Sequence, residues 1–254
     1  AMEVAAAAAY SGARAMVTMK QVGLNVAADP LMSLAYVGVK GGMVIVSADD
    51  PGPISSQTEQ DTRRFADFCR IPVFDPSSPE EAYKMIGEAF EYSEKYNTPV
   101  LFRPTTRVCH AYASIDNCDS PSPKKYEGFV KDSKKWVIFP RLSFANHIMI
   151  EKRNVEIGKD FSTYSANKAE GVNSEKAVVT SGISYAYTKE CLKDYPNVKL
   201  IKIATAYPFP EDFVLSSLEG AKEVLCIEEL SPFIEEQILK LAGKHGLQLR
   251  VSGK

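Results

Sequence analysis

Short apolar runs alternate with stretches of helical periodicity over the first part of the chain. This alternation predicts helix 2–15, strand 15–19, helix 30–39, strand 43–46, helix 57–69, strand 71–74, helix 79–96 and strand 100–102. Strands separated by helices are typical of βαβ units, in which helices cover both faces of a parallel sheet. We therefore predict an α/β domain with a parallel sheet over residues 1–115.

The alternation stops after residue 115 and resumes at residue 177. Polar stretches at 119–125 and 166–176 flank a predicted connecting helix over 142–157. Beyond them the pattern predicts strand 178–179, helix 183–193, strand 198–203, helix 211–218, strand 224–227, helix 232–243 and a final strand over 247–251. We predict a linker over 116–176 and a second, smaller α/β domain over 177–254.

Several helix starts carry capping signals. The pairs that place an N-cap before proline at the first helical position are Asp29-Pro30, Ser78-Pro79 and Ser231-Pro232. Ser55 or Ser56 is predicted to cap the helix over 57–69. The chain itself opens on an alanine run that has no such signal and stops directly after a predicted strand, which suggests a segment of a longer polypeptide.

Charge and composition exclude several classes of protein. The 30 Lys and Arg residues nearly balance 32 Asp and Glu residues, which argues against binding to nucleic acid. No apolar run is long enough to span a membrane, and the first residues show no basic stretch before an apolar run, so neither secretion nor membrane insertion is expected. The cysteines are scattered without a Cys-x-x-Cys pair and are interpreted as reduced thiols of a cytoplasmic protein: Cys69, Cys109, Cys118, Cys191 and Cys226. The three histidines are too far apart to indicate a metal site.

The loop after the first strand is the first candidate site, because ligands of open α/β sheets bind at the carboxyl ends of the strands. It offers a hydroxyl, a cation and two amides beside the flexible Gly23: Thr18, Lys20, Gln21 and Asn25. These groups suit an anionic or polar ligand. A solvated connection between strand and helix explains them equally well.

The loop after the second strand, residues 49–64, is the second candidate site. Pro51-Gly52-Pro53 imposes a tight turn, and Ser55, Ser56 and Gln57 follow it. Their side chains, together with the amides of a helix N-terminus, are suited to a substrate carboxylate. A capped helix start with a solvated charged face is the alternative interpretation.

Other polar clusters favour structural roles. Arg103 and Arg107 follow the last strand of the first domain, where Pro104 holds an extended path. Adjacent Cys109 and His110 diverge and do not form a nucleophile–base pair. The Glu228-Glu229 pair is explained by capping, and the sequence has no P-loop, Gly-x-Gly-x-x-Gly or Gly-Asp-Gly motif to hold a diphosphate.

Together these motifs resemble the alpha subunits of indolepyruvate:ferredoxin oxidoreductases across essentially the whole chain. In the first domain the resemblance is carried by Gly12–Ala15, Thr18–Asn25, Asp29–Ser33, Asp49–Pro53 and Ser55–Asp61. In the second it is carried by Thr180–Tyr185, Tyr207–Pro210 and Glu228–Gln237, which are similar to a transketolase C-terminal-like domain.

The resemblance implies a thiamine diphosphate enzyme that oxidatively decarboxylates arylpyruvates such as indolepyruvate to acyl-CoA and reduces ferredoxin. Mg²⁺ and 4Fe-4S clusters are its expected further cofactors, and a beta subunit, ferredoxin and further alpha copies are its expected partners. The first domain would bind the pyrimidine. On this interpretation Thr18, Lys20, Gln21 and Asn25 bind cofactor, and Ser55, Ser56 and Gln57 lie near substrate.

The resemblance also implies that parts of the enzyme are missing. The carboxylate that binds the aminopyrimidine is expected upstream of residue 1, so Glu3 is not that group and no catalytic residue is assigned. The diphosphate-binding domain and the cluster region are expected after Lys254, and the chain alone is predicted to be inactive. Ile54 stands where the family commonly has histidine, which leaves another 2-oxoacid as an alternative substrate, and the missing parts leave a non-catalytic assembly role as a second alternative.

Overall fold

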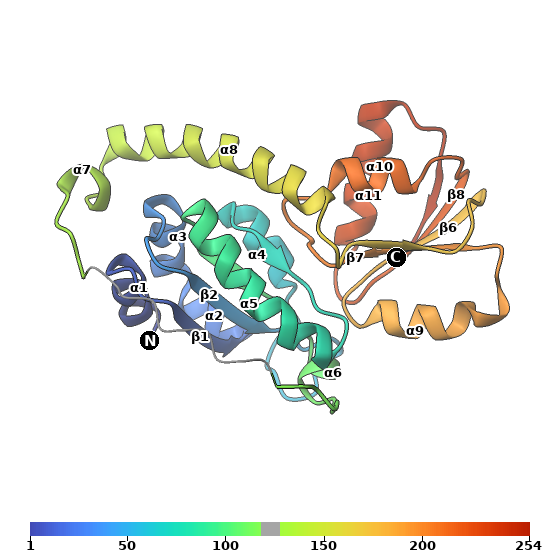
Figure 1. The fold of residues 1–254 in the computed structure, drawn as a ribbon, viewed down its shortest axis with the longest axis horizontal. Coiled ribbons are helices and arrows are strands. Elements are labelled where there is room, and N and C mark those ends of the chain that lie inside the picture. The colour runs from blue at the N-terminus through green and yellow to red at the C-terminus, as the bar shows by residue number, and fades with distance from the viewer. Residues whose placement is uncertain (118–127) are drawn as a thin grey trace.

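The first four strands form one parallel sheet in the computed structural model, which describes residues 1–117 and 128–254 (Figure 1). Its order is β1-β2-β4-β3, from strands β1 (Ala15–Lys20), β2 (Met43–Ala48), β3 (Val73–Phe74) and β4 (Val100–Phe102). Cys118 and the polar stretch 119–125 lie outside the described residues. The parallel sheet predicted for the first part of the chain is confirmed.

Helices cover both faces of this sheet. They are α1 (Met2–Tyr10), α2 (Gln21–Val26), α3 (Ala28–Val37), α4 (Thr62–Cys69), α5 (Pro79–Tyr96) and α6 (Thr106–Cys109). Successive strand residues point to opposite faces. Ile45 and Leu101 therefore pack with residues of α3 and α4, whereas Val44 and Phe102 pack with residues of α5.

The second sheet is mixed. Its order is β5-β7-β6-β8-β9, from β5 (Lys168–Glu170), β6 (Lys176–Ser181), β7 (Lys199–Ile203), β8 (Glu223–Ile227) and β9 (Arg250–Ser252). The strand β5 pairs antiparallel to β7, and the others pair in parallel. Its helical segments are α9 (Ser184–Cys191), a 3-10 turn (Leu192–Asp194), α10 (Glu211–Ser217) and α11 (Phe233–His245). Since β5 belongs to this sheet, the sheet begins inside the segment predicted as linker.

A long helix connects the two sheets. We call the first sheet with α1 to α6 the first unit, and the second sheet with α9 to α11 the second unit. After the short α7 (Ser133–Trp136), α8 (Pro140–Ser162) passes along the first unit to the second, as Figure 1 shows. It is longer than the helix predicted over 142–157. Ile150, Ile157 and Phe161 on α8 are buried, so this helix is part of the core. Among the described helices, none has the length and apolarity needed to cross a bilayer.

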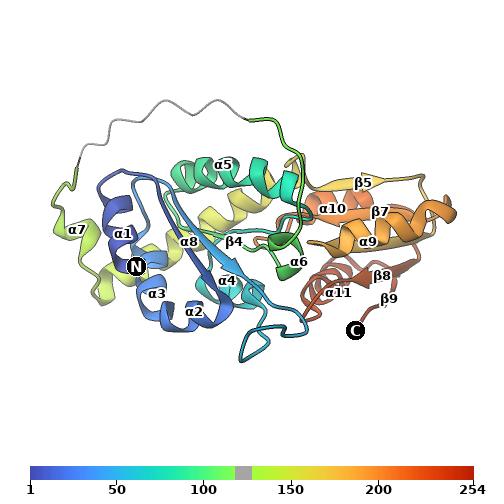
Figure 2. The ribbon, with the colours of Figure 1, turned by 90° about the horizontal axis from the view of Figure 1, so that it is seen from below.

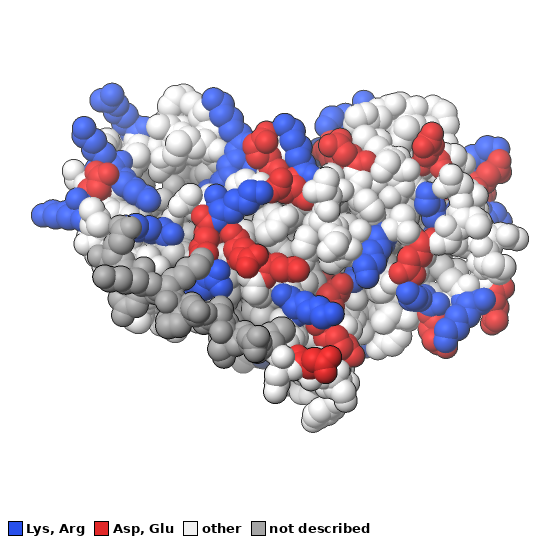
Figure 3. Space-filling model, viewed as in Figure 1, with Lys and Arg blue, Asp and Glu red and all other residues white. Residues whose placement is uncertain are grey.

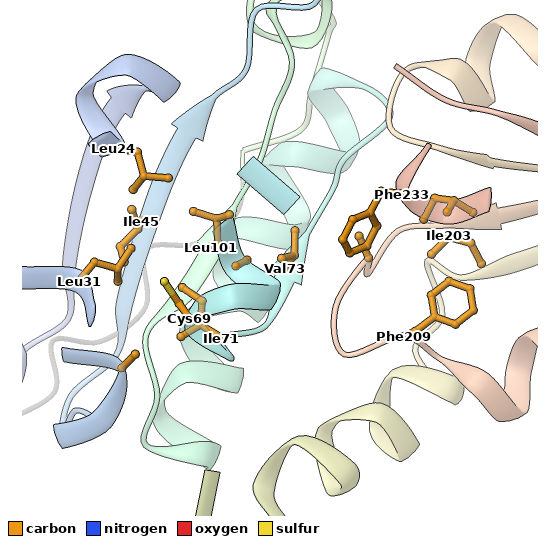
Figure 4. Packing of buried hydrophobic residues seen from close by; sticks show 14 of the residues in the cluster. Leu24, Leu31, Ile45, Cys69, Ile71, Val73, Leu101, Ile203, Phe209 and Phe233 are labelled. Atoms are coloured by element: carbon orange, nitrogen blue, oxygen red, sulfur yellow. The ribbon is translucent and has the colours of Figure 1, made fainter. Parts of the chain in front are cut away.

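The two sheets share one hydrophobic cluster. Ile45 and Val73 of the first unit belong to the same buried cluster as Ile203, Phe209 and Phe233 of the second (Figure 4). Backbone hydrogen bonds also join the units, because the Val73 amide donates to the Tyr207 carbonyl at 2.7 Å and the Asp75 amide donates to the Ala204 carbonyl at 2.8 Å. The loop that contains Tyr207 therefore extends the first sheet beyond β3.

One of the N-caps predicted from the sequence is observed in the structure, and the others are not. Ser78 accepts from the Glu81 amide with Pro79 at the first helical position, as predicted. The prediction for Asp29 was wrong, since α3 begins at Ala28 and places Asp29 in its first turn.

The cap of α4 is Asp61 rather than Ser55 or Ser56, because the helix starts only at Thr62. The predicted Ser231 cap is also wrong. Glu228 accepts hydrogen bonds from the Ile234 and Glu235 amides at the start of α11.

Candidate functional site

A buried arginine joins the carboxyl ends of three strands in the first sheet. Arg103 follows β4 and donates to Asp49 after β2 at 2.8 Å and to Asp75 after β3 at 3.2 Å. All three residues are buried. Burial raises the pKa of Asp49 and Asp75 although Arg103 opposes the shift. Burial by itself would lower the pKa of Arg103, but the charges of Asp75 and Asp49 outweigh this and raise it. The arginine therefore stays charged and holds this edge of the sheet together.

The next residue, Asp50, organises the loop between β2 and α4. Its Oδ2 accepts the amides of Ile54, Ser55 and Ser56 at 3.0 to 3.2 Å, and its Oδ1 accepts the Thr106 hydroxyl at 2.8 Å. The backbone N–H of Ser55, with the other donors, lowers the pKa of Asp50 and keeps it ionised. These amides are therefore engaged by Asp50, and they precede α4, which begins at Thr62, rather than form its N-terminus.

The segment predicted as the first loop is not a loop, since Thr18 and Lys20 lie at the end of β1 and Gln21 and Asn25 lie on α2; it packs against the loop after β2. Lys20 Nζ donates to Ser55 Oγ at 2.6 Å and lies 3.6 Å from Asp50 Oδ2. Gln21 Nε2 donates to the Thr58 carbonyl at 2.9 Å, and Asn25 Nδ2 donates to Gln60 Oε1 at 3.0 Å. Lys20, Gln21 and Asn25 thus lie together with the loop that follows β2.

The remaining predicted residues differ in their surroundings. Thr18 and Gln57 are exposed and take no part in these hydrogen bonds. Ser56 is half-buried, and its Oγ has no hydrogen-bond partner among the described residues. The structure therefore brings Lys20, Gln21, Asn25, Ser55 and Ser56 together and leaves Thr18 and Gln57 at the surface.

A cavity of about 330 Å³ lies beside α2 and α4. It is lined by two of the predicted residues, Gln21 and Asn25, together with Gln60, Phe65 and Phe68. Gln21 is buried, and its Oε1 has no hydrogen-bond partner in the described part of the chain. The cavity combines amide donors and acceptors with aromatic faces, a lining that suits a planar heterocycle.

Arg63 connects this region to the second unit. Its guanidinium is fully buried and bonds Asp61 Oδ2 at 2.6 Å, Glu228 Oε2 at 2.8 Å and Ser181 Oγ at 3.1 Å. It also donates to the carbonyls of Glu229 and Ser231. Burial alone would raise the pKa of Asp61, but the Arg63 charge outweighs it and lowers that pKa to about 2.

The hydrogen bonds of Arg63 hold the start of α4 against the second unit. Figure 2 shows the loop before α4 extending toward α11. Sequence reasoning missed the roles of Asp50 and Arg63. The signal available for Asp50 was an acidic pair directly after a buried strand. Nothing in the sequence pairs Arg63 with Glu228, because 165 positions separate them.

No protein-family model matches the chain. Its whole length is 38% identical to indolepyruvate oxidoreductase subunit IorA of Pyrococcus horikoshii and 41% identical to the subunit of the same name from Thermococcus kodakarensis. The IorA subunit of Methanothermobacter thermautotrophicus is also 41% identical to it. This chain is a relative of the IorA subunits along its whole length. It spans only 40 to 42% of the length of these three curated relatives.

Two solved structures share the fold. One is a 2-oxoglutarate:ferredoxin oxidoreductase from Magnetococcus marinus with 2-oxoglutarate, coenzyme A and succinyl-CoA bound, at a TM-score of 0.70 and 15% identity, covering 99% of this chain and 52% of that one. The other is a split-gene transketolase in an inactive beta4 tetramer, at a TM-score of 0.64 and 14% identity, covering 99% and 70%. The predicted fold class, a parallel-sheet α/β domain followed by a second α/β domain, is confirmed, and both solved structures share this fold.

Proposed function

We propose that this chain forms part of a thiamine diphosphate-dependent oxidoreductase that decarboxylates arylpyruvates, with indolepyruvate converted to indoleacetyl-CoA and electrons passed to ferredoxin. Similarity to the IorA subunits along the whole of this chain carries this proposal. The first sheet with its helices would then be the pyrimidine-binding domain, and the second sheet, which begins with β5 at Lys168 rather than at 177, would be the transketolase C-terminal-like domain.

The cavity beside α2 supports a role in holding the cofactor. When bound, the cofactor supplies the electron sink for decarboxylation. Gln21 and Asn25 would bind ring nitrogens, and the buried, unpartnered Oε1 of Gln21 is an acceptor suited to an amino group. Lys20 and Thr18 would border the same cleft, with Ser55, Ser56 and Gln57 on the side of the substrate.

The residues described here do not fit a metal ion or an iron–sulfur cluster. No group of three or more His, Cys, Asp or Glu side chains in 1–117 and 128–254 is placed to hold one. We assign the Mg²⁺ and 4Fe-4S centres to no residue of this segment. We also propose that the chain needs a beta subunit, ferredoxin, further alpha copies and coenzyme A, and that it is inactive alone.

Reconstitution of the complete enzyme tests this function. The full-length subunit and its partner subunit, supplied with thiamine diphosphate, Mg²⁺ and coenzyme A, are expected to reduce ferredoxin with indolepyruvate and phenylpyruvate. Gln21→Ala is expected to raise the concentration of cofactor required, whereas the matched change Gln237→Ala, on α11, leaves it unchanged. Ferredoxin reduction by the 254-residue chain alone would contradict the proposal of inactivity.

One observation favours another 2-oxoacid as substrate. Ile54 is 71% exposed in the loop that carries Ser55, at the position where the family commonly has histidine. If a histidine there contacts an aryl substrate, Ile54→His increases kcat/KM for indolepyruvate relative to 2-oxoisovalerate and 2-oxoglutarate. A wild-type preference for either of these acids establishes the alternative substrate, and failure of every acid in the complete complex supports an assembly role.

A further inference from the structure

A second cavity lies on the opposite side of the first unit from the loop after β2. It has a volume of about 630 Å³ and is bounded by the ends of α3 and α5, by α7 and by the first half of α8. This volume is within the range of small-molecule sites. The proposed oxidoreductase site uses none of its residues.

The cavity contains an arginine whose charge is not paired. Arg153 projects from α8, and its Nε and Nη2 atoms are buried with no hydrogen-bond partner among the described residues. Burial lowers the pKa of Arg153 to about 10, opposed only by Tyr207, since no carboxylate of the described residues offsets the cost of removing its charge from water. A buried guanidinium is normally paired, so an anion is the missing partner.

The free edge of Arg153 has a specific shape. Nε and Nη2 form one edge of the planar guanidinium, where two parallel N–H groups match two oxygens of a carboxylate or a phosphate. The remaining charges around the cavity point to the same sign of ligand. Lys134, Lys135 and Lys152 line it with Arg153, together with Lys95, which is paired with Asp160, and with the single described carboxylate of the lining, Glu156.

That carboxylate is already engaged, because Glu156 Oε1 lies 2.8 Å from Lys159 Nζ. Figure 3 shows Lys and Arg side chains gathered over the region of α7 and α8 on this face. The local charge is therefore positive although the chain as a whole has a net charge of −2.

Much of the rest of the lining is apolar, beside the amides of Asn97 and Asn146. Val39, Leu142, Met149 and Ile150 contribute aliphatic walls, and Tyr36 adds an aromatic one. Inorganic anions alone would leave these walls unused. We propose that this cavity binds a small organic anion whose carboxylate or phosphate pairs with Arg153 and whose apolar body packs against Leu142 and Ile150.

Calorimetric titration of the 254-residue chain tests the site. The probes are 1-naphthoate and 1-naphthyl phosphate, which share an apolar body and separate the two anion chemistries, with neutral 1-naphthamide and inorganic phosphate as controls. At least one naphthyl anion is expected to bind more tightly than both controls. Arg153→Met weakens that anion on the order of tenfold or more, the loss expected for a hydrogen-bonded charge.

Two further variants make the outcome decisive. Arg250→Met removes a highly exposed arginine from β9 and is expected to leave binding unchanged. Leu142→Trp fills the apolar part without touching Arg153 and is expected to weaken the naphthyl anions, which tests the site even if Arg153→Met fails to fold. Absence of saturable naphthyl binding to wild type, or unchanged binding in folded Arg153→Met, overturns the proposal, as does equal affinity for inorganic phosphate.

Discussion

Asp50 and Arg63 each bind several backbone groups, which is how one side chain fixes a whole loop. Asp50 accepts three consecutive amides after the Pro51-Gly52-Pro53 turn. Arg63 donates to two carbonyls of the second unit. These Asp50 contacts lie within one loop, whereas those of Arg63 form only when distant segments meet, so the candidate site depends on a few buried charges as well as on the loop sequence.

The Asp50 contacts predict a local change on mutation. Asp50→Ala removes the shared acceptor, so the amides of Ile54, Ser55 and Ser56 are expected to exchange hydrogen on the order of tenfold faster or more. Hydrogen-exchange mass spectrometry of peptides covering 51–60 measures this. Asp67→Ala, which removes an exposed carboxylate from α4, should leave those peptides unaffected; unchanged exchange in Asp50→Ala would show that Asp50 does not hold the loop.

Asp61 predicts a dependence of stability on pH. Its folded pKa of about 2 lies below the value of about 4 expected in the unfolded chain. The stabilisation is therefore complete above pH 4 and is lost as the pH falls toward 2. We expect the difference in unfolding free energy between wild type and Asp61→Asn to be smaller at pH 3 than at pH 6.

The unfolding free energies of wild type and Asp61→Asn are compared with each other because the raised pKa values of Asp49 and Asp75 also make stability depend on pH. That dependence has the opposite sign to the one from Asp61 and is present in both proteins, so it cancels in the difference. Urea denaturation at the two pH values measures it. Asp116→Asn, at an exposed position, provides the control. A gap that stays constant between pH 6 and pH 3 would be inconsistent with a depressed Asp61 pKa.

At the scale of elements, caps and strand-end charges set where helices and strands stop. The helix α5 begins where Ser78 caps it, and three strands end where Arg103 bonds Asp49 and Asp75. The helix α4 begins late because Asp61, and neither Ser55 nor Ser56, supplies its cap. The intervening residues are therefore free to form the loop beside α2.

The cap of α5 predicts a modest loss of stability. Ser78→Ala leaves the Glu81 amide without its acceptor and is expected to lower the unfolding free energy by about 1 kcal/mol. Chemical denaturation followed by circular dichroism measures the change. Ser33→Ala, at an exposed position inside α3, is the matched control and is expected to be neutral or slightly stabilising.

At the scale of the whole molecule, the shared core and the Arg63 network make one cooperative unit of two sheets. Val73 and Phe233 belong to one cluster, and Arg63 bonds Glu228 across the junction. Since neither sheet buries its facing side chains without the other, we expect a single unfolding transition in calorimetry.

Removing Arg63 is expected to weaken that unit strongly. Arg63→Met leaves Asp61 and Glu228 buried without their cation, which typically costs about 3 to 5 kcal/mol. Denaturant unfolding measures this loss, and Arg250→Met, at an exposed ion pair, should cost less than about 1 kcal/mol. Equal losses in the two variants, or two separate transitions in wild type, would contradict the coupled description.

The sequence by itself determined the alternation of helices and strands, the parallel first sheet and the Ser78 cap, because apolar periodicity and capping are local properties. It also placed Lys20, Gln21, Asn25, Ser55 and Ser56 at one edge of that sheet. Only the tertiary structure decided that β5 joins the second sheet, that Asp50 is held by Thr106 while it binds the amides of its own loop, and that Arg63 reaches Glu228. The contacts to Thr106 and Glu228 join residues far apart in the chain, and their strength comes from burial, which no local pattern contains.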